Sequence, residues 1–290
     1  MIRQYHLSIG LAACLCLGPW FAQAEAPRAI PKLFAKAAVA IDAKTGTFLY
    51  QKNAGDKRAV ASTQKLLTAL VISEAGGFET MVKVEATDTR VEPSKVGIKT
   101  GREYPKGLLF QALLVKSGND VARCLARDHS GGQDNFRPVL NAKARQLGMG
   151  DSNFMNAHGL TVDDQYSTAR DMAKLAFMAY RNEDIRQAVM LKELEFPKKD
   201  RVDKFENTNQ LLQRYPFVTG MKTGFTNTAG RCLISSGSFD GSEVIAVVLG
   251  SDEKHVWDDS ESLLRWGLRV PDEPVEEEAQ DTEAGSDSSS

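Results

Sequence analysis

Three short motifs with chemically useful side chains follow one another along the 290-residue chain. They supply a serine with a lysine three residues later, a second serine near an amide, and a lysine followed by a hydroxyl. A serine beside a base can attack a carbonyl group and carry the acyl group as a covalent intermediate. The motifs are Ser62-Thr63-Gln64-Lys65, Ser117-Gly118-Asn119 and Lys222-Thr223-Gly224. Their order matters most, because Ser-x-x-Lys recurs at Ser251 and Lys-Thr-Gly at Lys44 and Lys99.

The surroundings of Ser62 favour it over Ser251 as a nucleophile. Residues 66–72 are almost all apolar and Gly76-Gly77 follows, a pattern that predicts a buried helix with a glycine end signal. Ser251 follows the apolar run 244–249 and lies among charged residues, which predicts a solvated turn.

Lys65 is the only charged residue between Ser62 and Glu74. At three residues from the serine it is expected on the same helix face. Loss of hydration lowers the pKa of a lysine, which would let Lys65 act as a general base near neutral pH. The competing interpretation is a lysine whose amine reaches the surface along its flexible stem.

The three Lys-Thr-Gly copies differ in their neighbours. Lys44 lies between the apolar runs 37–41 and 48–50 and is expected in a hairpin turn. Lys99 is expected in a polar loop. Lys222 belongs to a predicted strand, where Lys222 and Thr223 can present a cation and a hydroxyl to a substrate carboxylate, and Gly224 leaves room for a ligand at the backbone.

Ser117 falls between two helical patterns, 108–115 and 121–126. A plain helix cap explains Ser117, Gly118 and Asn119 on local grounds. The functional interpretation of this segment depends on its position between the other two motifs.

The chain resembles the D-alanyl-D-alanine carboxypeptidase family, the low-molecular-mass penicillin-binding proteins, from about residue 37 to 270. The resemblance implies a β-lactamase/transpeptidase-like α+β fold, with an antiparallel five-stranded sheet flanked by helices and an all-helical lobe. No cofactor or metal is implied. The segments that carry the resemblance are 61–66, 117–120, 156–160, 167–171, 207–209 and 220–226 with Ala229-Gly230.

The resemblance also implies a division of roles. Ser62 would attack the carbonyl between two terminal D-alanines of a peptidoglycan stem peptide, and Lys65 would take its proton. Ser117 would relay the proton to the leaving amine, and Asn119 would position the peptide and Lys65.

The resemblance implies three further roles, which involve the third motif and the residue that follows it. Lys222 would exert electrostatic control near Ser117, and Thr223 would bind the terminal carboxylate. The backbone amides of Ser62 and Phe225 would form the oxyanion hole. Stem peptides and covalently bound β-lactam antibiotics are the expected partners, and nucleic acid is not.

Two features depart from the family pattern. The family often carries an arginine after the last strand, whereas residues 254–257 have none, which leaves Lys254 or His255 as possible stand-ins. The extra β-rich domain and amphipathic helix of familiar carboxypeptidases are also missing. Residues 224–227 and 230–233 resemble DD-endopeptidases, which cut crosslinks between stem peptides, so this activity is the main alternative.

Other classes are less consistent with the sequence. A class A β-lactamase needs a loop glutamate for deacylation, and residues 137–141 hold the leucine and asparagine of such a loop without a glutamate. His129, His158 and His255 lack the His-Glu-x-x-His spacing of a zinc peptidase. An inactive wall-binding protein would not need an intact Ser62 and Lys65.

The pattern of apolar runs predicts the architecture. Strands from both ends of the domain must pair in one sheet, with a helical lobe at about 62–200 and a cleft between them. The expected strands are 37–42, 47–51, 217–224, 232–239 and 244–250, with a closing helix at 258–267.

The chain ends predict export. Arg3, an apolar stretch at 7–21 and Ala22-Gln23-Ala24 are typical of a signal peptide over 1–24, although Cys14 could instead carry a lipid anchor. We therefore expect a periplasmic or wall-side protein with no later transmembrane anchor. Residues 271–290 hold eight acidic and no basic side chains and are expected to be disordered. The domain between, 25–270, has a net charge near +5, and its two cysteines, Cys124 and Cys232, leave a disulfide open.

Overall fold

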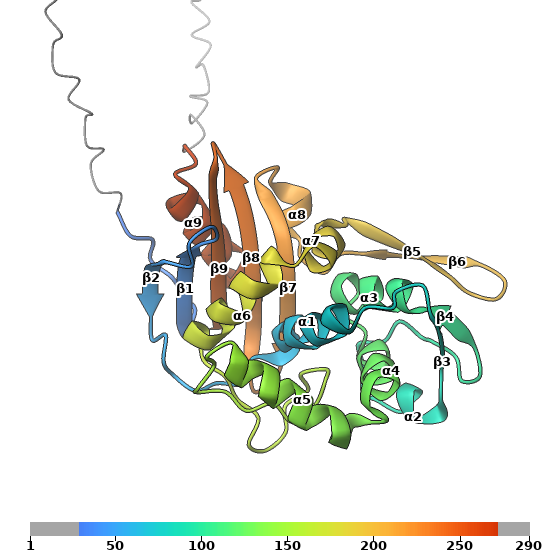
Figure 1. Ribbon diagram of the computed structural model, residues 1–290. Coiled ribbons are helices and arrows are strands. Elements are labelled where there is room, and N and C mark those ends of the chain that lie inside the picture. The colour runs from blue at the N-terminus through green and yellow to red at the C-terminus, as the bar shows by residue number, and fades with distance from the viewer. Residues whose placement is uncertain (1–28, 272–290) are drawn as a thin grey trace, which may run out of the picture.

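A five-stranded antiparallel sheet forms the centre of the computed structural model, which describes residues 29–271 (Figure 1). The predicted sheet is confirmed, and strands from both ends of the chain pair in it, since β1 lies beside β9. The order is β2-β1-β9-β8-β7, with bounds Phe48–Lys52, Ala37–Asp42, Ser242–Ser251, Gly230–Phe239 and Val218–Thr226. The predicted signal peptide with Cys14, and the tail from 272 on, lie outside the described residues.

Both faces of the sheet are covered, which explains why its strands are almost continuously apolar. Alternate residues of β1 point to opposite faces. Ala37, Val39 and Ile41 join a core shared with α6 (Ala169–Arg181), whereas Ala38 and Ala40 join a core shared with α9 (His255–Leu268). Figure 1 shows α6 in front of the sheet and α9 behind it. The β7 edge is left beside the helical lobe.

Helix α1 (Lys65–Ala75) is the buried centre of the lobe. Residues 65–73 are all buried, and the helix ends at Gly76, whose φ of 66° is the positive value that favours glycine. Five helices surround α1, so its apolar residues find partners on every side. They are α3 (Lys106–Val115), α4 (Asn119–Ser130), α5 (Gln133–Gln146), α6 and α7 (Glu183–Met190).

The lobe also contains strands that the sequence pattern did not predict. β3 (Met81–Lys83) pairs with β4 (Glu103–Pro105), and β5 (Glu193–Pro197) pairs with β6 (Val202–Glu206). The β5–β6 hairpin projects away from the body of the molecule (Figure 1). A short helix, α8 (Leu211–Arg214), leads into β7. Among residues 29–271, no helix is long and apolar enough to span a bilayer.

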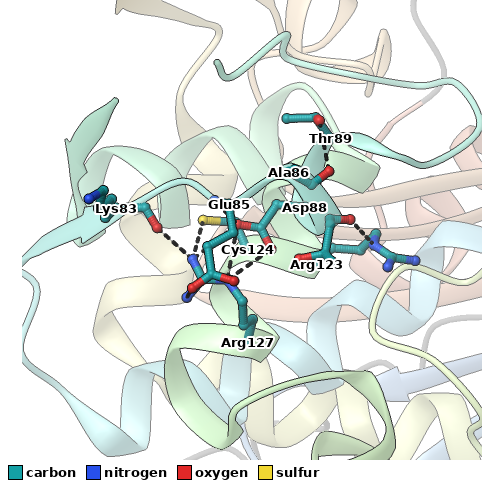
Figure 2. Close-up of polar contacts among 9 residues, drawn as sticks. Lys83, Glu85, Ala86, Asp88, Thr89, Arg123, Cys124 and Arg127 are labelled. Carbon is teal, nitrogen blue, oxygen red and sulfur yellow. Dashed lines mark hydrogen bonds and ion pairs between the residues drawn. The ribbon is translucent and has the colours of Figure 1, made fainter. Parts of the chain in front are cut away.

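An ion pair between Arg127 and the buried Asp88 ties α4 to residues 83–88 (Figure 2). The Arg127 Nε donates to Asp88 Oδ1 at 3.0 Å, and its Nη2 donates to Asp88 Oδ2 at 3.0 Å and to the Lys83 carbonyl at 2.6 Å. Asp88 belongs to the short helix α2 (Ala86–Thr89), where it also accepts the Glu85 N–H at 2.8 Å. This network joins α4 to residues 83–88.

The two described cysteines are both buried and unpaired. Cys124 lies beside Arg127 in α4, and Cys232 lies in β8. Burial raises the pKa of both thiols, that of Cys232 to about 11. Each therefore packs as a small apolar side chain.

Two of the local predictions can be compared with the structure. Lys44 and Lys99 are exposed, in a turn and a loop, as expected. The predicted solvated turn at Ser251 is wrong. Ser251 ends β9, is 8% exposed and donates its hydroxyl to Asp259 Oδ2 at 3.0 Å. This contact has no local sequence signature, because Asp259 comes from the facing helix α9.

Candidate active site

Ser62 and Lys65 meet at the junction of two helical segments. Ser62 lies in the 3-10 turn η1 (Ala61–Gln64), and Lys65 is the first residue of α1. Since a 3-10 turn has three residues per turn, residues three apart lie in line. The Lys65 Nζ is 2.8 Å from the Ser62 Oγ. A base therefore stands within hydrogen-bond reach of a half-buried hydroxyl.

The amine of Lys65 is fully buried and surrounded by oxygen acceptors. It donates to Asn119 Oδ1 at 2.8 Å and to the His158 carbonyl at 2.5 Å. Burial holds its pKa well below 10.5, and the positive charge of Lys222 lowers it further. A neutral amine has two N–H groups and one lone pair. With both N–H groups given to these two acceptors, the lone pair is left to accept the Ser62 O–H.

Lys222 provides a second buried amine on β7. Burial lowers its pKa from 10.5 to about 7, and its Nζ donates to the Thr223 carbonyl at 3.1 Å. Burial therefore lowers the pKa of both amines. A proton on Lys222 disfavours one on Lys65, because two like charges would then lie close together.

The second motif forms the turn between α3 and α4. Ser117 has a φ of 65°, in the left-handed region that non-glycine residues rarely adopt, and it lines the same cleft as Ser62. Asn119 begins α4, and its Nδ2 donates to the carbonyls of Glu92 and Pro93 at 3.1 and 3.0 Å. These two contacts aim the Asn119 oxygen at Lys65.

Two glycines let the backbone press against the nucleophile turn. A Cβ on Gly224 would lie 2.9 Å from the Ser62 nitrogen, and one on Gly159 would lie 2.2 Å from the Ala61 carbonyl oxygen. Gly224 also lines the cleft, and only the side on which a Cβ would point is filled by the turn at residues 61–63. β7 and η1 approach so closely that only a glycine fits between them.

A cleft of about 840 Å³ runs between β7 and the lobe. Thr223 donates its hydroxyl to the Thr208 hydroxyl at 2.7 Å on this wall. Phe225 is 50% exposed. Lys65 and Lys222 lie buried behind the cleft. Six of the eight predicted residues line it, namely Ser62, Ser117, Asn119, Thr223, Gly224 and Phe225.

Neither stand-in for the missing arginine lines the cleft. The His255 Nδ1 contacts Asp252 Oδ2 at 2.7 Å, and its ring stacks on Phe34 at 3.7 Å between centroids. Lys254 is exposed at the start of α9. The cation that does line this wall is Arg231 of β8.

Sequence reasoning missed three contributors. The His158 carbonyl has no side-chain signature, because any residue could supply it. The His158 ring itself is neutral, since burial is the main cause that lowers its pKa to about 3. Thr208 was part of a recognised segment without a role. Arg231 could only be placed once the register of β8 was known.

Comparison with known proteins gives the family. The model of the D-alanyl-D-alanine carboxypeptidase family, peptidase S11, matches residues 22–253. The chain belongs to this family of serine DD-peptidases.

Two curated relatives illustrate its range. The chain is 34% identical to D-alanyl-D-alanine carboxypeptidase DacF of Bacillus subtilis over 224 residues, which cover 75% of this chain and 57% of DacF. It is 29% identical to the D-alanyl-D-alanine endopeptidase of Escherichia coli over 278 residues, which cover 91% of this chain and 88% of that protein.

Solved structures agree with the fold. A D-alanyl-D-alanine carboxypeptidase of Mycobacterium tuberculosis superposes with a TM-score of 0.80 at 30% identity, over 85% of this chain and 96% of that one. The Streptomyces K15 DD-transpeptidase gives a TM-score of 0.79 at 27% identity, over 84% and 100%. The transpeptidase-like fold is therefore confirmed.

Proposed function

We propose that this protein is a serine-type D-alanyl-D-alanine carboxypeptidase that removes the terminal D-alanine from peptidoglycan stem peptides. The observation that carries the proposal is the buried amine of Lys65, 2.8 Å from the Ser62 hydroxyl. Its depressed pKa suits a base that works near neutral pH. The chain's family membership supplies the substrate class.

In the proposed reaction the Ser62 Oγ bonds to the carbonyl carbon between the two D-alanines while Lys65 takes the hydroxyl proton. The carbon–nitrogen bond then breaks, and the departing amine receives a proton through Ser117. Free D-alanine leaves, and the peptide remains as an ester on Ser62. Water then attacks this ester, and the shortened peptide is released.

The remaining residues stabilise charge and position the peptide. The amides of Ser62 and Phe225 would bind the oxyanion, held in place by the close approach at Gly224. Thr223, steadied by Thr208, would bind the terminal carboxylate. Lys222 would add positive charge at the leaving-group end, where Ser117 works. Asn119 would hold Lys65 and the peptide backbone.

A DD-endopeptidase that cuts crosslinks is the second candidate. The observation in its favour is the alignment with the E. coli endopeptidase over 91% of this chain and 88% of that protein. Both activities use the same acyl-enzyme and differ in the amine that leaves. Action on peptidoglycan places the protein outside the cytoplasm in either case.

Labelled penicillin tests the shared chemistry. It should acylate the purified protein, and Ser62→Ala should abolish the label, whereas Ser251→Ala in the other Ser-x-x-Lys copy should retain it. Persistent labelling of Ser62→Ala would move the nucleophile elsewhere. Incubation with a pentapeptide and with a crosslinked muropeptide then separates the two activities. A carboxypeptidase releases D-alanine from the pentapeptide, whereas an endopeptidase cleaves the crosslinked dimer.

A further inference from the structure

The cleft extends from Phe225, at the expected oxyanion position on β7, to Arg231 on β8. Lys222 and Thr223 belong to the leaving-group end in the proposed reaction, and the Phe225 amide would hold the oxyanion. The wall past Phe225 therefore faces the acyl-donor half of the peptide, on the amino-terminal side of the bond that breaks.

Arg231 occupies this part of the wall. The register of β7 and β8 places Phe225 opposite Arg231, and directly opposed residues share a face of the sheet. The guanidinium lies over the Phe225 ring at 4.5 Å from its centroid, and Arg231 lines the cleft. Stacking on an aromatic face holds a guanidinium in one plane and leaves its edge open to a bidentate partner.

The partner that Arg231 has in the structure is easily exchanged. Its Nη2 donates to Glu253 Oε1 at 2.8 Å, but the Glu253 side chain is 84% exposed and that of Arg231 is 34% exposed. Exposed ion pairs contribute little to stability. A carboxylate from a bound peptide can therefore replace Glu253, and Arg231 has five N–H donors to offer it.

The charges around the cleft favour an anion at this point. Among the described cleft-lining residues, Arg231 is the charged side chain of the β7–β8 wall. The lining cations Lys116 and Lys204 come from the opposite wall, where Glu206 supplies the negative charge. The proposed reaction uses none of these four residues.

We propose that Arg231 binds a carboxylate on the side chain of the residue that precedes the two D-alanines. The direction of the peptide in this proposal rests on the proposed function. A peptide beside the β7 edge would lie two strand spacings, roughly 10 Å, from β8. A donor side chain of several carbons and the Arg231 side chain, which already reaches over the Phe225 ring, can together span that gap. Arg231 therefore selects a donor side chain that ends in an amine and a carboxylate over one that ends in an amine alone.

A pair of β-lactams tests this selection, because the acyl side chain of a β-lactam takes the donor position. One cephalosporin carries an acyl chain ending in an amine and a carboxylate, and the other carries the same chain without the carboxylate. The wild-type protein should be acylated about tenfold faster by the first. In Arg231→Ala this ratio should fall to about one, and in Arg231→Lys it should lie between.

Lys204→Ala, which removes a cation from the opposite wall, is the matched control and should keep the ratio. A ratio near one in the wild-type protein, or a ratio that survives Arg231→Ala, overturns the assignment. D-alanine release from a pentapeptide is measured separately. Its absence would refute the carboxypeptidase activity while the acylation ratio still reports on Arg231, because a β-lactam reacts with the serine of either kind of DD-peptidase.

Discussion

Replacing Lys222 with methionine should make the protein more stable and less reactive. Lys222 is fully buried, and burial lowers its pKa from 10.5 to about 7. That difference corresponds to about 5 kcal/mol, at about 1.36 kcal/mol per pKa unit, as an upper figure for what the buried charge costs. Methionine keeps most of the apolar stem and carries no charge, so the substitution opens little space.

The sign of this effect depends on pH. Below pH 7 the folded protein must hold a buried charge that the unfolded chain holds in water, so the cost is fully present there. It is relieved as the pH rises from about 7 to 10.5, because the folded state loses its proton first. Lys222→Met should therefore raise the free energy of unfolding by about 3 kcal/mol at pH 6, which corresponds to a rise in Tm of about 6–12 °C. The increase should be smaller at pH 9.

Thermal unfolding at pH 6 and pH 9 measures this gain, and labelled penicillin measures the acylation rate, which should drop at least about tenfold. Lys99→Met is the matched control, since it changes an exposed lysine in the same tripeptide and should alter neither quantity. A Lys222→Met protein that is less stable at pH 6, or equally stabilised at both pH values, would refute the reasoning.

Three further predictions concern the site and its support. Gly224→Ala places a Cβ 2.9 Å from the Ser62 nitrogen and should slow acylation by about 10- to 100-fold, whereas Gly150→Ala, which meets nothing within 4 Å, should leave the labelling rate unchanged. The pH profile of acylation should rise through the depressed pKa of Lys65 and reach its plateau well below pH 10; a rise that continues to pH 10 would exclude Lys65 as the base. Asp88→Asn should cost about 2–4 kcal/mol in urea unfolding because it leaves Arg127 without its buried carboxylate, and an unchanged unfolding midpoint would count against that pair.

The sheet could be predicted from the sequence because its signal is local. The run 37–42 is apolar at every position but the last, and the structure gives β1 the same bounds. The contact between Ser62 and Lys65 could be predicted as well, because their spacing of three residues places them on one face of a helical turn. Both predictions required only the residue types and the number of residues per turn of a helix or per repeat of a strand.

The parts that could not be predicted depend on contacts between distant segments. Ser251 looked exposed because its partner Asp259 lies on a helix that folds back over the sheet. The role of Gly224 depends on a turn from residue 61 onward, far away in the sequence. The β3–β4 and β5–β6 hairpins are short and contain charged residues, so their apolar pattern is weak.

The site is also where local preference and the global fold disagree. Ala61 and Ser117 have φ values of 49° and 65°, each of which costs roughly 1 kcal/mol or more for a residue with a Cβ. Each stands next to or within a catalytic motif, and Gly159 presses on the Ala61 carbonyl from outside. Two buried lysines add a further cost at the same place. A chain selected only for stability would avoid both the positive φ values and the buried amines. Because both costs occur at one cleft, we infer that the surrounding fold holds Ser62 and Lys65 in a geometry that they would not adopt alone.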